Sequence, residues 1–515
     1  MTFIGSHILS LTVFLPLIGM FLVLCLPSHW KKEIRLASLF ISLGALLLAT
    51  LCFLRIKGTG EFEIMELAEW IPALSVTYHL GMDGTSAALL LMTAILVPIS
   101  ILASWHEIDK SVKMFHALIL LLETGMLGVF LALDVFLFYI FWELVLIPMY
   151  FIIGIWGSGD RVRVAIKFVL FTMVGSVLML VAILYAAKVT GTFNILAWYA
   201  HNFAAKEQLW LFGAFALAFA IKVPLIGFHT WLPDAHTEAP TAGSILLAGV
   251  LLKMGSYGFF RFAMPLFPAA VAHFAPAILT FAVAGIILGA LLAMVQPDIK
   301  RLVAYSSVSH MGFVILGLAA LEKQAVAGAV LQMVNHGITT GALFLMIGML
   351  YGRKHTRLIA DWGGTARSLP ILSIFFIFMV LSSMGLPGLN NFAGEFLILI
   401  GSFQTQTIYS AIAIIGVILA AAYLLWAVLP IFFGPLQHEE EKQLLDMRPR
   451  EYLELIPVVI IIVIIGVWPQ GVLSKIWNSA DAFIKLSKRV EHTVILSGAK
   501  NPVKTGDPSP SAQGD

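Results

Sequence analysis

Five ionisable residues stand inside long apolar stretches of this sequence, where charged side chains are rare. They are Glu123, Glu143, Lys222, Lys253 and Glu395. A charge at the middle of a membrane-spanning helix costs roughly 2.5–3.5 kcal/mol on insertion scales, so such a residue pairs, faces the protein interior or borders water. Burial and pairing shift the proton affinities of lysine and glutamate in opposite directions. A lysine and a glutamate that approach and separate can therefore take up and release a proton.

Two other roles are open to these residues: a permanent ion pair that locks two helices, or a side chain that reaches the membrane surface. Glu143, Lys222 and Lys253 lie near the middle of their apolar runs, which favours proton transfer. Glu123 lies in the first half of its run, so a scaffold or interface role fits it equally well.

Two histidines, His310 and His336, also lie in apolar runs and have hydroxyl-bearing neighbours. Imidazole titrates at a pKa of about 6.5 in water, so it passes protons readily near neutral pH. An isolated buried histidine is more often a core residue, but these two lie between Lys253 and Glu395 in the sequence, which favours a relay. His229 and His236 are expected near the membrane edge, as loop structure or as a proton entrance. We expect no metal site, because carboxylate and sulfur ligands are not grouped with these histidines.

Helix-breaking residues accompany two of the intramembrane charges. Pro224 follows Lys222 closely, and Gly385, Pro387 and Gly388 precede Glu395. Proline lacks an amide hydrogen and clashes with the preceding turn, so both helices should break. Freed backbone groups at membrane depth are tolerated only inside protein or beside a wet cavity, and paired interruptions point to an ion pathway in transporters. A simple proline kink is the alternative.

The composition predicts an all-α integral membrane protein. The chain has 515 residues, of which 60% are hydrophobic and 12% are charged. A spanning helix needs about 20 apolar residues, and about fourteen such runs occur, at 8–26, 36–54, 85–105, 114–133, 135–156, 165–187, 209–228, 244–262, 276–295, 302–321, 325–350, 371–403, 408–433 and 453–467.

The two breaks suggest two five-helix repeats in tandem, which an odd helix number places in opposite orientations. We expect them at 113–262 and 276–433, after three N-terminal helices in 1–112 and before a last helix and polar tail in 434–515. Residues 485–515 of the tail are expected to be disordered. Lys and Arg are denser in alternate loops (31–35, 110–113, 161–167, 300–301 and 353–367), which predicts a cytoplasmic location for those loops and periplasmic termini.

Several functions are excluded by composition. A net charge of +2 argues against nucleic acid as a partner. Two cysteines, Cys25 and Cys52, cannot hold a four-cysteine iron–sulfur cluster, and the sequence has neither a dinucleotide-binding GxGxxG motif after a strand nor a P-loop. Any electron chemistry must therefore take place on other chains. The run at 8–26 lacks the features of a cleaved signal peptide, so we expect a retained helix.

The segments 221–240 (IKVPLIGFHTWLPDAHTEAP) and 251–258 (LLKMGSYG) resemble the signature of the proton-translocating antiporter-like subunits of respiratory complex I, the NADH-quinone oxidoreductase. The segments 141–144 (FWEL), 154–157 (GIWG) and 165–176 (AIKFVLFTMVGS) resemble one particular chain of that group. Glu395 supports the same chain, because its relatives have lysine at that broken helix. The resemblance extends over the third to the thirteenth expected helix.

The resemblance implies a membrane-arm subunit with inverted five-helix repeats. In it, Glu143 and Lys222 would form a modulating pair and Lys253 would be the central proton carrier. His310 and His336 would bridge to Glu395, the exit group. NADH, FMN, iron–sulfur clusters and quinone would bind partner subunits, with no cofactor in this chain. Flanking antiporter-like chains, lipid and protons would be its partners, in the inner (cytoplasmic) membrane.

Three other classes remain open from the sequence. They are a subunit of a multi-subunit sodium/proton antiporter, the membrane arm of a hydrogenase complex, and an inert scaffold that retains the charges. The neighbouring genes would distinguish the oxidoreductase, antiporter and hydrogenase hypotheses, because each of these complexes has distinct companion chains.

Overall fold

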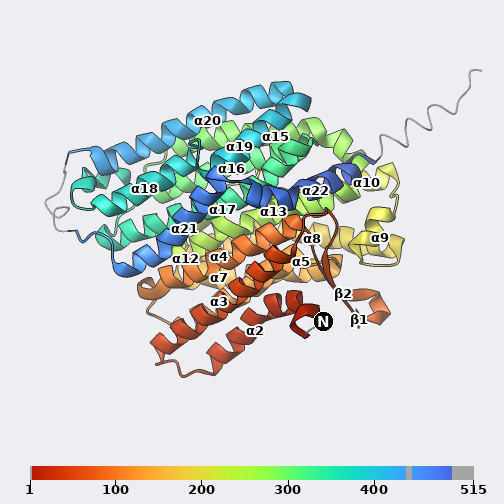
Figure 1. Cartoon of the computed structure of the whole chain (residues 1–515), viewed down its shortest axis with the longest axis horizontal. Helices are drawn as coiled ribbons and strands as arrows, with labels where there is room; N and C mark the ends of the chain where they lie inside the picture. Colours follow the sequence, from red (N-terminus) through yellow and green to blue (C-terminus); the bar gives the residue numbers. More distant parts are fainter. Residues whose placement is uncertain (1–2, 436–443, 490–515) are drawn as a thin grey trace, which may run out of the picture.

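The apolar runs of this chain form long helices that lie side by side and cross an elongated bundle from end to end (Figure 1). The structure is a computed structural model and describes residues 3–435 and 444–489. Backbone polar groups in lipid must be bonded within their own segment, which is why helices dominate. One end of the bundle carries a two-stranded sheet, and we call it the hairpin end; the other is the opposite end.

Eleven helical segments in the described residues are long and apolar enough to cross a membrane alone. They are α2 (Ile8–Cys25), α3 (Lys31–Arg55), α4 (Gly84–Glu107), α5 (Val112–Leu131), α6 with α7 (Val135–Trp156), α8 (Arg161–Thr190), α12 to α14 (Thr241–Leu266), α15 (Pro268–Met294), α16 (Ile299–Ala319), α17 (Lys323–Lys354) and α20 with η6 (Thr407–Phe433). A twelfth is the pair α21 (Pro449–Val467) and α22 (Gln470–Ser487), bent by 64°. The multi-helix membrane fold is confirmed, but the count of about fourteen is not.

The difference in the count has a local cause, because the remaining apolar runs are interrupted. The run at 209–228 is helical only up to Lys222, where α10 (Ala205–Lys222) ends, and α11 (Trp231–Glu238) begins after an unwound turn. The run at 371–403 is divided into α18 (Pro370–Ser383) and α19 (Asn390–Thr405). Neither piece of each broken helix is both long and apolar enough to cross alone.

The two breaks have the same backbone geometry. Leu225 N–H donates to the Ala220 carbonyl at 2.8 Å, and Leu386 N–H donates to the Leu381 carbonyl at 3.1 Å. Gly227 and Gly388 then adopt φ values of +92° and +93°, which glycine reaches without steric cost. A constant spacing of 161 residues separates the paired positions.

This spacing pairs Pro224 with Gly385, so the prolines do not occupy matching places, contrary to the expectation from sequence. It also pairs Lys222 with Ser383 and Asp234 with Glu395. The second break therefore carries its acidic residue after the bend, where the first break carries its lysine before the bend.

The broken helices cross the bundle in opposite directions. α10 begins beside residues of the hairpin end, and α11 finishes beside Ser158 at the opposite end. α18 begins at the opposite end, where Asp446 accepts from its first backbone amides, and α19 finishes at Thr405, which bonds Ala320 next to the hairpin end. Antiparallel broken helices are what inverted repeats require; the repeat boundaries at 113–262 and 276–433 remain a prediction.

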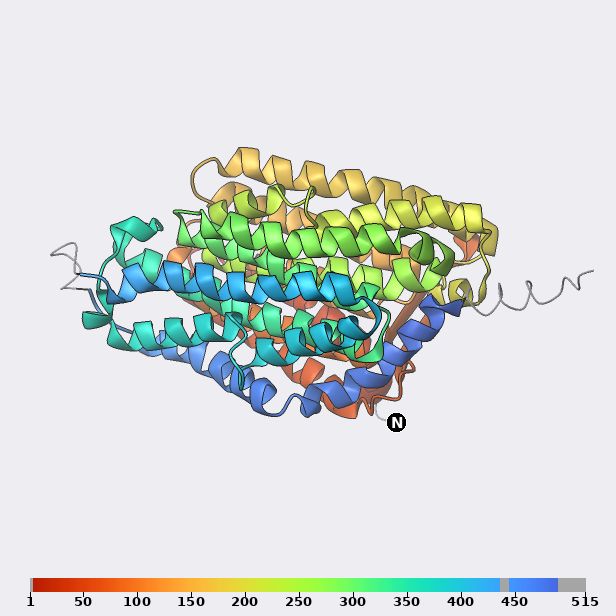
Figure 2. The same ribbon diagram turned by 90° about the horizontal axis from the view of Figure 1, so that it is seen from above.

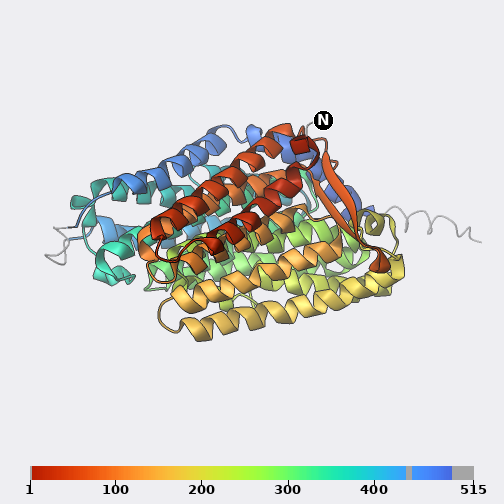
Figure 3. The same cartoon turned by 90° about the horizontal axis from the view of Figure 1, so that it is seen from below.

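Burial separates the helices into an interior and a periphery. In the most apolar 18-residue stretch of each helix, all residues of Thr241–Leu266 are buried, as are 94% of those in α16 and α17. The buried share is only 28% in α3 and 39% in α8 and in α20 with η6. Figure 2 and Figure 3 show α20 and α8 on outer sides of the bundle, and α2 and α3 across another. The interior helices are the ones that carry Lys253, His310 and His336.

The sequence did not predict the hairpin of β1 (Ile64–Ile71) and β2 (Val76–Met82), which pair antiparallel. Glu66 of β1 accepts hydrogen bonds from the backbone amides of Leu9 and Ser10 at the start of α2. Helix α22 lies against the same end, where Lys475 bonds the Ile56 carbonyl. Because α22 extends to Ser487, the first residues of the expected disordered tail are helical; residues 490–515 lie outside the described residues.

The shorter elements of the described chain connect or interrupt these helices. They are α1 (Phe3–Ser6), η1 (Pro72–Leu74), α9 (Ile195–Ala200), η4 (Ile359–Asp361) and η5 (Thr365–Arg367). The span Thr241–Leu266 consists of α12 (Thr241–Leu246), η2 (Leu247–Leu251), α13 (Leu252–Gly258), η3 (Phe259–Ala263) and α14 (Met264–Leu266), and η6 (Leu429–Phe433) ends α20 (Thr407–Val428). α6 (Val135–Leu144) and α7 (Leu146–Trp156) share one span.

Helix α21 packs directly on the second break, so a larger side chain at this contact should lower the stability of the protein. A Cβ on Gly466 would lie 2.3 Å from the carbonyl oxygen of Gly388. Gly466→Ala should therefore destabilise the protein by about 1–3 kcal/mol, the usual cost of overpacking, and lower the midpoint of thermal unfolding in mild detergent. Gly213→Ala is the control, because a Cβ there meets nothing within 4 Å. An unchanged midpoint for Gly466→Ala would show that α21 does not support the break.

Candidate proton-transfer site

Lys253 lies in the middle of the span Thr241–Leu266 and is fully buried. The π-helical turn η2 precedes it, a feature that often occurs at functional sites. Its ammonium nitrogen donates to the Ala248 carbonyl at 2.6 Å and lies 2.6 Å from Nδ1 of His336. Nδ1 of a neutral imidazole accepts when Nε2 carries the hydrogen. The structure thus brings together the expected carrier and one of the two expected bridging histidines.

His310 and Glu395 form the next contact. Nδ1 of His310 lies 2.7 Å from Oε1 of Glu395, and the amide of Gln332 donates to the same oxygen at 2.9 Å. An ionised carboxylate only accepts, so Nδ1 of His310 carries the hydrogen in that state. On the other side of the ring, Nε2 of His310 is 3.5 Å from the hydroxyl of Tyr423. All four side chains are buried.

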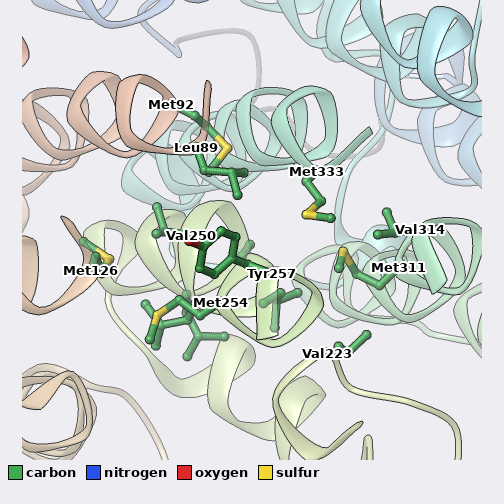
Figure 4. Packing of buried hydrophobic residues seen from close by; sticks show 14 of the residues in the cluster. Leu89, Met92, Met126, Val223, Val250, Met254, Tyr257, Met311, Val314 and Met333 are labelled. Carbon is green, nitrogen blue, oxygen red and sulfur yellow. The ribbon is translucent and has the colours of Figure 1, made fainter. Parts of the chain in front are cut away.

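The two histidines link these contacts. The ring centroids of His310 and His336 are 5.6 Å apart, and Nε2 of His336 is buried without a hydrogen-bond partner. Lys253, His336, His310 and Glu395 therefore form a line across helices α13, α17, α16 and α19, which we call the relay. Figure 4 shows Met254, Met311 and Met333 of three of these helices, α13, α16 and α17, within the buried hydrophobic cluster.

Lys222 and Glu143 are near each other but not in ion-pair contact. The Lys222 ammonium is buried without a hydrogen-bond partner and lies over the rings of Trp142 and Phe168, at 5.1 Å and 5.8 Å from their centroids. Cation–π contact partly replaces lost hydration. Lys222 Nζ and Glu143 Oε1 both lack a hydrogen-bond partner, so the two side chains do not form a direct ion pair, and their role as a modulating pair stays a prediction.

The segment that bears Lys253 packs closely on Lys222. A Cβ on Gly255 would lie 3.0 Å from Cβ of Lys222 and 2.9 Å from the Phe219 carbonyl oxygen. The two lysines therefore belong to helices in direct contact, with Gly255 only two residues from Lys253.

Glu123 is fully buried in α5, and neither carboxylate oxygen has a hydrogen-bond partner. This rules out the membrane-interface role that the sequence left open. Within the described residues, no hydrogen bond or ion pair joins Glu123 to the relay or to Lys222. Its role in proton transfer stays a prediction.

The structure separates the two histidines that were expected near the membrane edge. His229 lies in the first break, where its Nδ1 accepts from the Gly227 amide, as a loop-structure role requires. His236 is fully buried, and its ring stacks at 4.6 Å on Phe344 with both nitrogens unpaired. His236 is therefore enclosed by protein and unpaired, and its expected place near the membrane edge stays a prediction.

Sequence reasoning missed the side chains that support the relay. Gln332 precedes His336 by four residues, one turn on the same helix face, so its spacing could have been noticed. Asn390 accepts from the Ser382 hydroxyl at 2.6 Å and donates its side-chain amide to the Asn335 carbonyl at 3.2 Å. The side chain of Asn335 in α17 donates in turn to the Asn390 carbonyl at 2.7 Å, and these bonds clamp the second break. Nothing in the apolar sequence around Tyr423 indicated that its hydroxyl would lie near His310. In the described parts of the chain, no group of three or more His, Cys, Asp or Glu residues could hold a metal ion.

Comparison with known proteins provides independent information. A family model described as NADH:quinone oxidoreductase/Mrp antiporter, transmembrane, matches residues 132–421. NADH-ubiquinone oxidoreductase chain 4 of Chondrus crispus is 41% identical over 488 residues, which cover 94% of this chain and 98% of that protein. NADH-quinone oxidoreductase subunit M of Rickettsia typhi is 38% identical over 484 residues, with coverage of 92% and 98%.

Solved structures agree with these relatives. A chain of respiratory complex I from Thermus thermophilus with bound NADH matches with a TM-score of 0.86 and 34% identity, and covers 93% of this chain and 99% of that one. A chain of the Mrp complex from Dietzia sp. DQ12-45-1b matches with a TM-score of 0.81 and 20% identity, at 95% and 99% coverage. The second similarity concerns the fold alone.

The different partners of Lys222 and Glu395 lead to opposite predictions for stability. Lys222→Met should leave unchanged or raise the thermal midpoint of the purified protein, because it removes a buried charge without a hydrogen bond. Glu395→Ala should lower stability by about 1–3 kcal/mol, because His310 and Gln332 lose their buried acceptor. If Lys222→Met lowered the midpoint as much as Glu395→Ala, Lys222 would instead belong to a locking ion pair.

Proposed function

Because this chain belongs to the NADH:quinone oxidoreductase/Mrp antiporter family of membrane proteins, we propose that it conducts protons through its buried relay as the M-type (chain 4) subunit of an NADH:quinone oxidoreductase. Its relatives at about 40% identity carry that name over nearly the whole chain. Electron transfer from NADH to quinone would occur on other subunits, so this chain itself acts as a non-redox translocase.

The observation that carries this proposal is the relay. Four ionisable side chains from four different helices lie in sequence across the most buried part of the protein. Charged and polar groups at membrane depth are costly unless they serve an ion pathway or pair with one another. A locking ion pair needs two groups and accounts for neither the unpaired His336 Nε2 nor the unpaired Lys222 ammonium.

Proton transfer along the relay uses both nitrogens of each imidazole. A protonated Lys253 donates to Nδ1 of His336, 2.6 Å away, and His336 then releases the proton of Nε2. Transfer to His310 crosses the 5.6 Å between the rings through a bridging water or by ring rotation. His310 donates from Nδ1 to Glu395, which acts as the exit group.

Glu143 and Lys222 set the direction of transfer by electrostatics. When Glu143 stays apart from Lys222, the unpaired ammonium repels a proton on Lys253, across directly packed helices. When Glu143 closes on Lys222, the repulsion falls and Lys253 can be reloaded. Two lysines in the low-dielectric interior interact much more strongly than in water.

The surroundings of the subunit follow from the same proposal. NADH, FMN, iron–sulfur clusters and quinone would bind partner subunits, and flanking antiporter-like chains would contact its outer helices. The chain would lie in the inner (cytoplasmic) membrane, with both termini and the hairpin end on the periplasmic side and Glu395 discharging towards that side. The relatives' membership of a multi-subunit complex supports the partner subunits, and the uneven distribution of Lys and Arg among the loops supports the orientation.

A sodium/proton antiporter subunit is the second candidate, because the chain shares its fold with a component of the Mrp complex. The higher identity to the oxidoreductase subunits favours the first candidate. The same identity leaves a hydrogenase-type membrane arm less well supported than the oxidoreductase subunit.

Lys222→Ala should spare assembly but reduce NADH-driven quinone reduction and proton pumping in membrane vesicles by about tenfold or more, which corresponds to about 1.4 kcal/mol of lost electrostatic interaction with Lys253. Lys188→Ala is the control, because Lys188 is exposed near the end of α8. Normal coupled turnover in Lys222→Ala, at normal subunit abundance, would contradict the proposed function.

Replacements of Glu395 test the exit step. Glu395→Gln should block proton release, because an amide cannot ionise, whereas Glu395→Asp should retain part of the pumping rate. Both variants keep an oxygen acceptor for Gln332, so differences in folding should be small. Pumping by both variants at the wild-type rate, measured with a pH-sensitive dye, would remove Glu395 from the pathway.

A further inference from the structure

A second polar cluster lies on the same span as Lys253 but outside the relay. The guanidinium of Arg261, in the π-helical turn η3, lies 2.7 Å from Oδ1 of Asp83. Nε of Arg261 donates to the hydroxyl of Tyr257 at 3.1 Å, and Nη2, the same terminal nitrogen that contacts Asp83, donates to the Ser86 hydroxyl at 3.3 Å. The hydroxyls of Tyr257 and Ser86 are 3.1 Å apart.

This cluster is closed on all sides. Tyr257 and Ser86 are fully buried, Asp83 is 2% exposed and Arg261 is 6% exposed. The guanidinium carbon lies 4.8 Å from the ring centroid of Phe62, and further aromatic rings from the same helix enclose it. Such enclosure fixes the guanidinium in a low-dielectric environment, where its charge acts strongly on a proton at close range although Asp83 balances it at a distance.

The cluster lies between Lys253 and the hairpin end. Tyr257 follows Lys253 by four residues in α13, one turn and roughly 6 Å along the helix axis. Asp83 directly follows β2, and Phe62 precedes β1, so both belong to the hairpin end. A proton that moved from Lys253 along this face would reach the hairpin end without passing through the histidines or Glu395.

The hydrogen bonds of the cluster oppose such a route. Serine and tyrosine hydroxyls both donate and accept, so Tyr257 and Ser86 alone could extend a proton path. Arg261 only donates and keeps its charge, so Tyr257 accepts from it and directs its own hydrogen to the Phe130 carbonyl at 3.0 Å. A fixed arginine charge also repels hydrated protons, as in pores that exclude them.

We propose that Arg261, held by Asp83, is an electrostatic seal that prevents Lys253 from exchanging protons directly with the hairpin end and so directs them through the histidines to Glu395. This inference rests on the proposed function of the relay. Arg261 acts through its charge and its position, and it takes no proton itself.

The test measures passive proton leak through the whole purified complex in liposomes, without NADH, after an imposed pH step reported by an entrapped dye. Arg261→Met should leak severalfold faster than wild type, because the charge is lost. Arg261→Gln should leak as well, and it keeps a donor for Asp83 and Tyr257, so it serves if the methionine variant does not assemble. Arg261→Lys should remain tight, since it restores the charge.

The path of the leak distinguishes a seal from general loosening. If protons escape through Lys253, the double variant with Arg261→Gln and Lys253→Met should be tight again. Arg353→Met is the matched control, because Arg353 forms a comparably buried 2.7 Å ion pair with Glu451 at the opposite end. Loss of that pair should not raise the leak per assembled complex.

Three results would overturn the seal: a tight Arg261→Gln complex of normal abundance, a leak that persists in the double variant, or an equal leak in Arg353→Met. Each can occur while pumping still depends on Lys222, in which case only the seal is rejected. Normal pumping by Lys222→Ala would reject the proposed function itself.

Discussion

The low dielectric of the bundle interior is the constraint on which this structure depends. Every charge placed there must be compensated by a partner or be able to lose its proton. Arg261 cannot lose its proton. It is paired with Asp83, and the hydroxyls of Tyr257 and Ser86 accept its other hydrogen bonds. Lys253 and Glu395 can change protonation state, and they contact histidines, which can do so too. The same rule thus separates permanent charges from transferable ones.

The positions of the relay residues were predictable from sequence because their cost in an apolar run makes them conspicuous. Lys253, His310, His336 and Glu395 were identified in this way, and the structure places them in one line. The lack of a direct ion pair between Lys222 and Glu143 was not predictable, because the cation–π contacts of Lys222 depend on tertiary packing. The buried position of His236 depends in the same way on the fold around α11.

Elements that are held by hydrogen bonds, and not by apolar packing, could not be predicted from the hydrophobic pattern of the sequence. The hairpin is held by backbone pairing and by Glu66, and the second break is clamped by Asn390, none of which changes the hydropathy pattern. The count of about fourteen helices is not confirmed, because the pieces of the two broken runs are not each long and apolar enough to cross alone. The shared geometry at Gly227 and Gly388 appeared only when backbone hydrogen bonds could be compared.

The separation of interior and peripheral helices has a consequence for how the protein responds to its membrane. The outer helices α3, α8 and α20 are among the least buried and carry none of the four relay residues. A thinner or thicker bilayer is accommodated by tilt and by local adjustment of lipid-facing helices. His310 and His336 lie on the buried helices α16 and α17, behind these outer helices. The thickness of the membrane can therefore vary without changing the distance between the two imidazole rings.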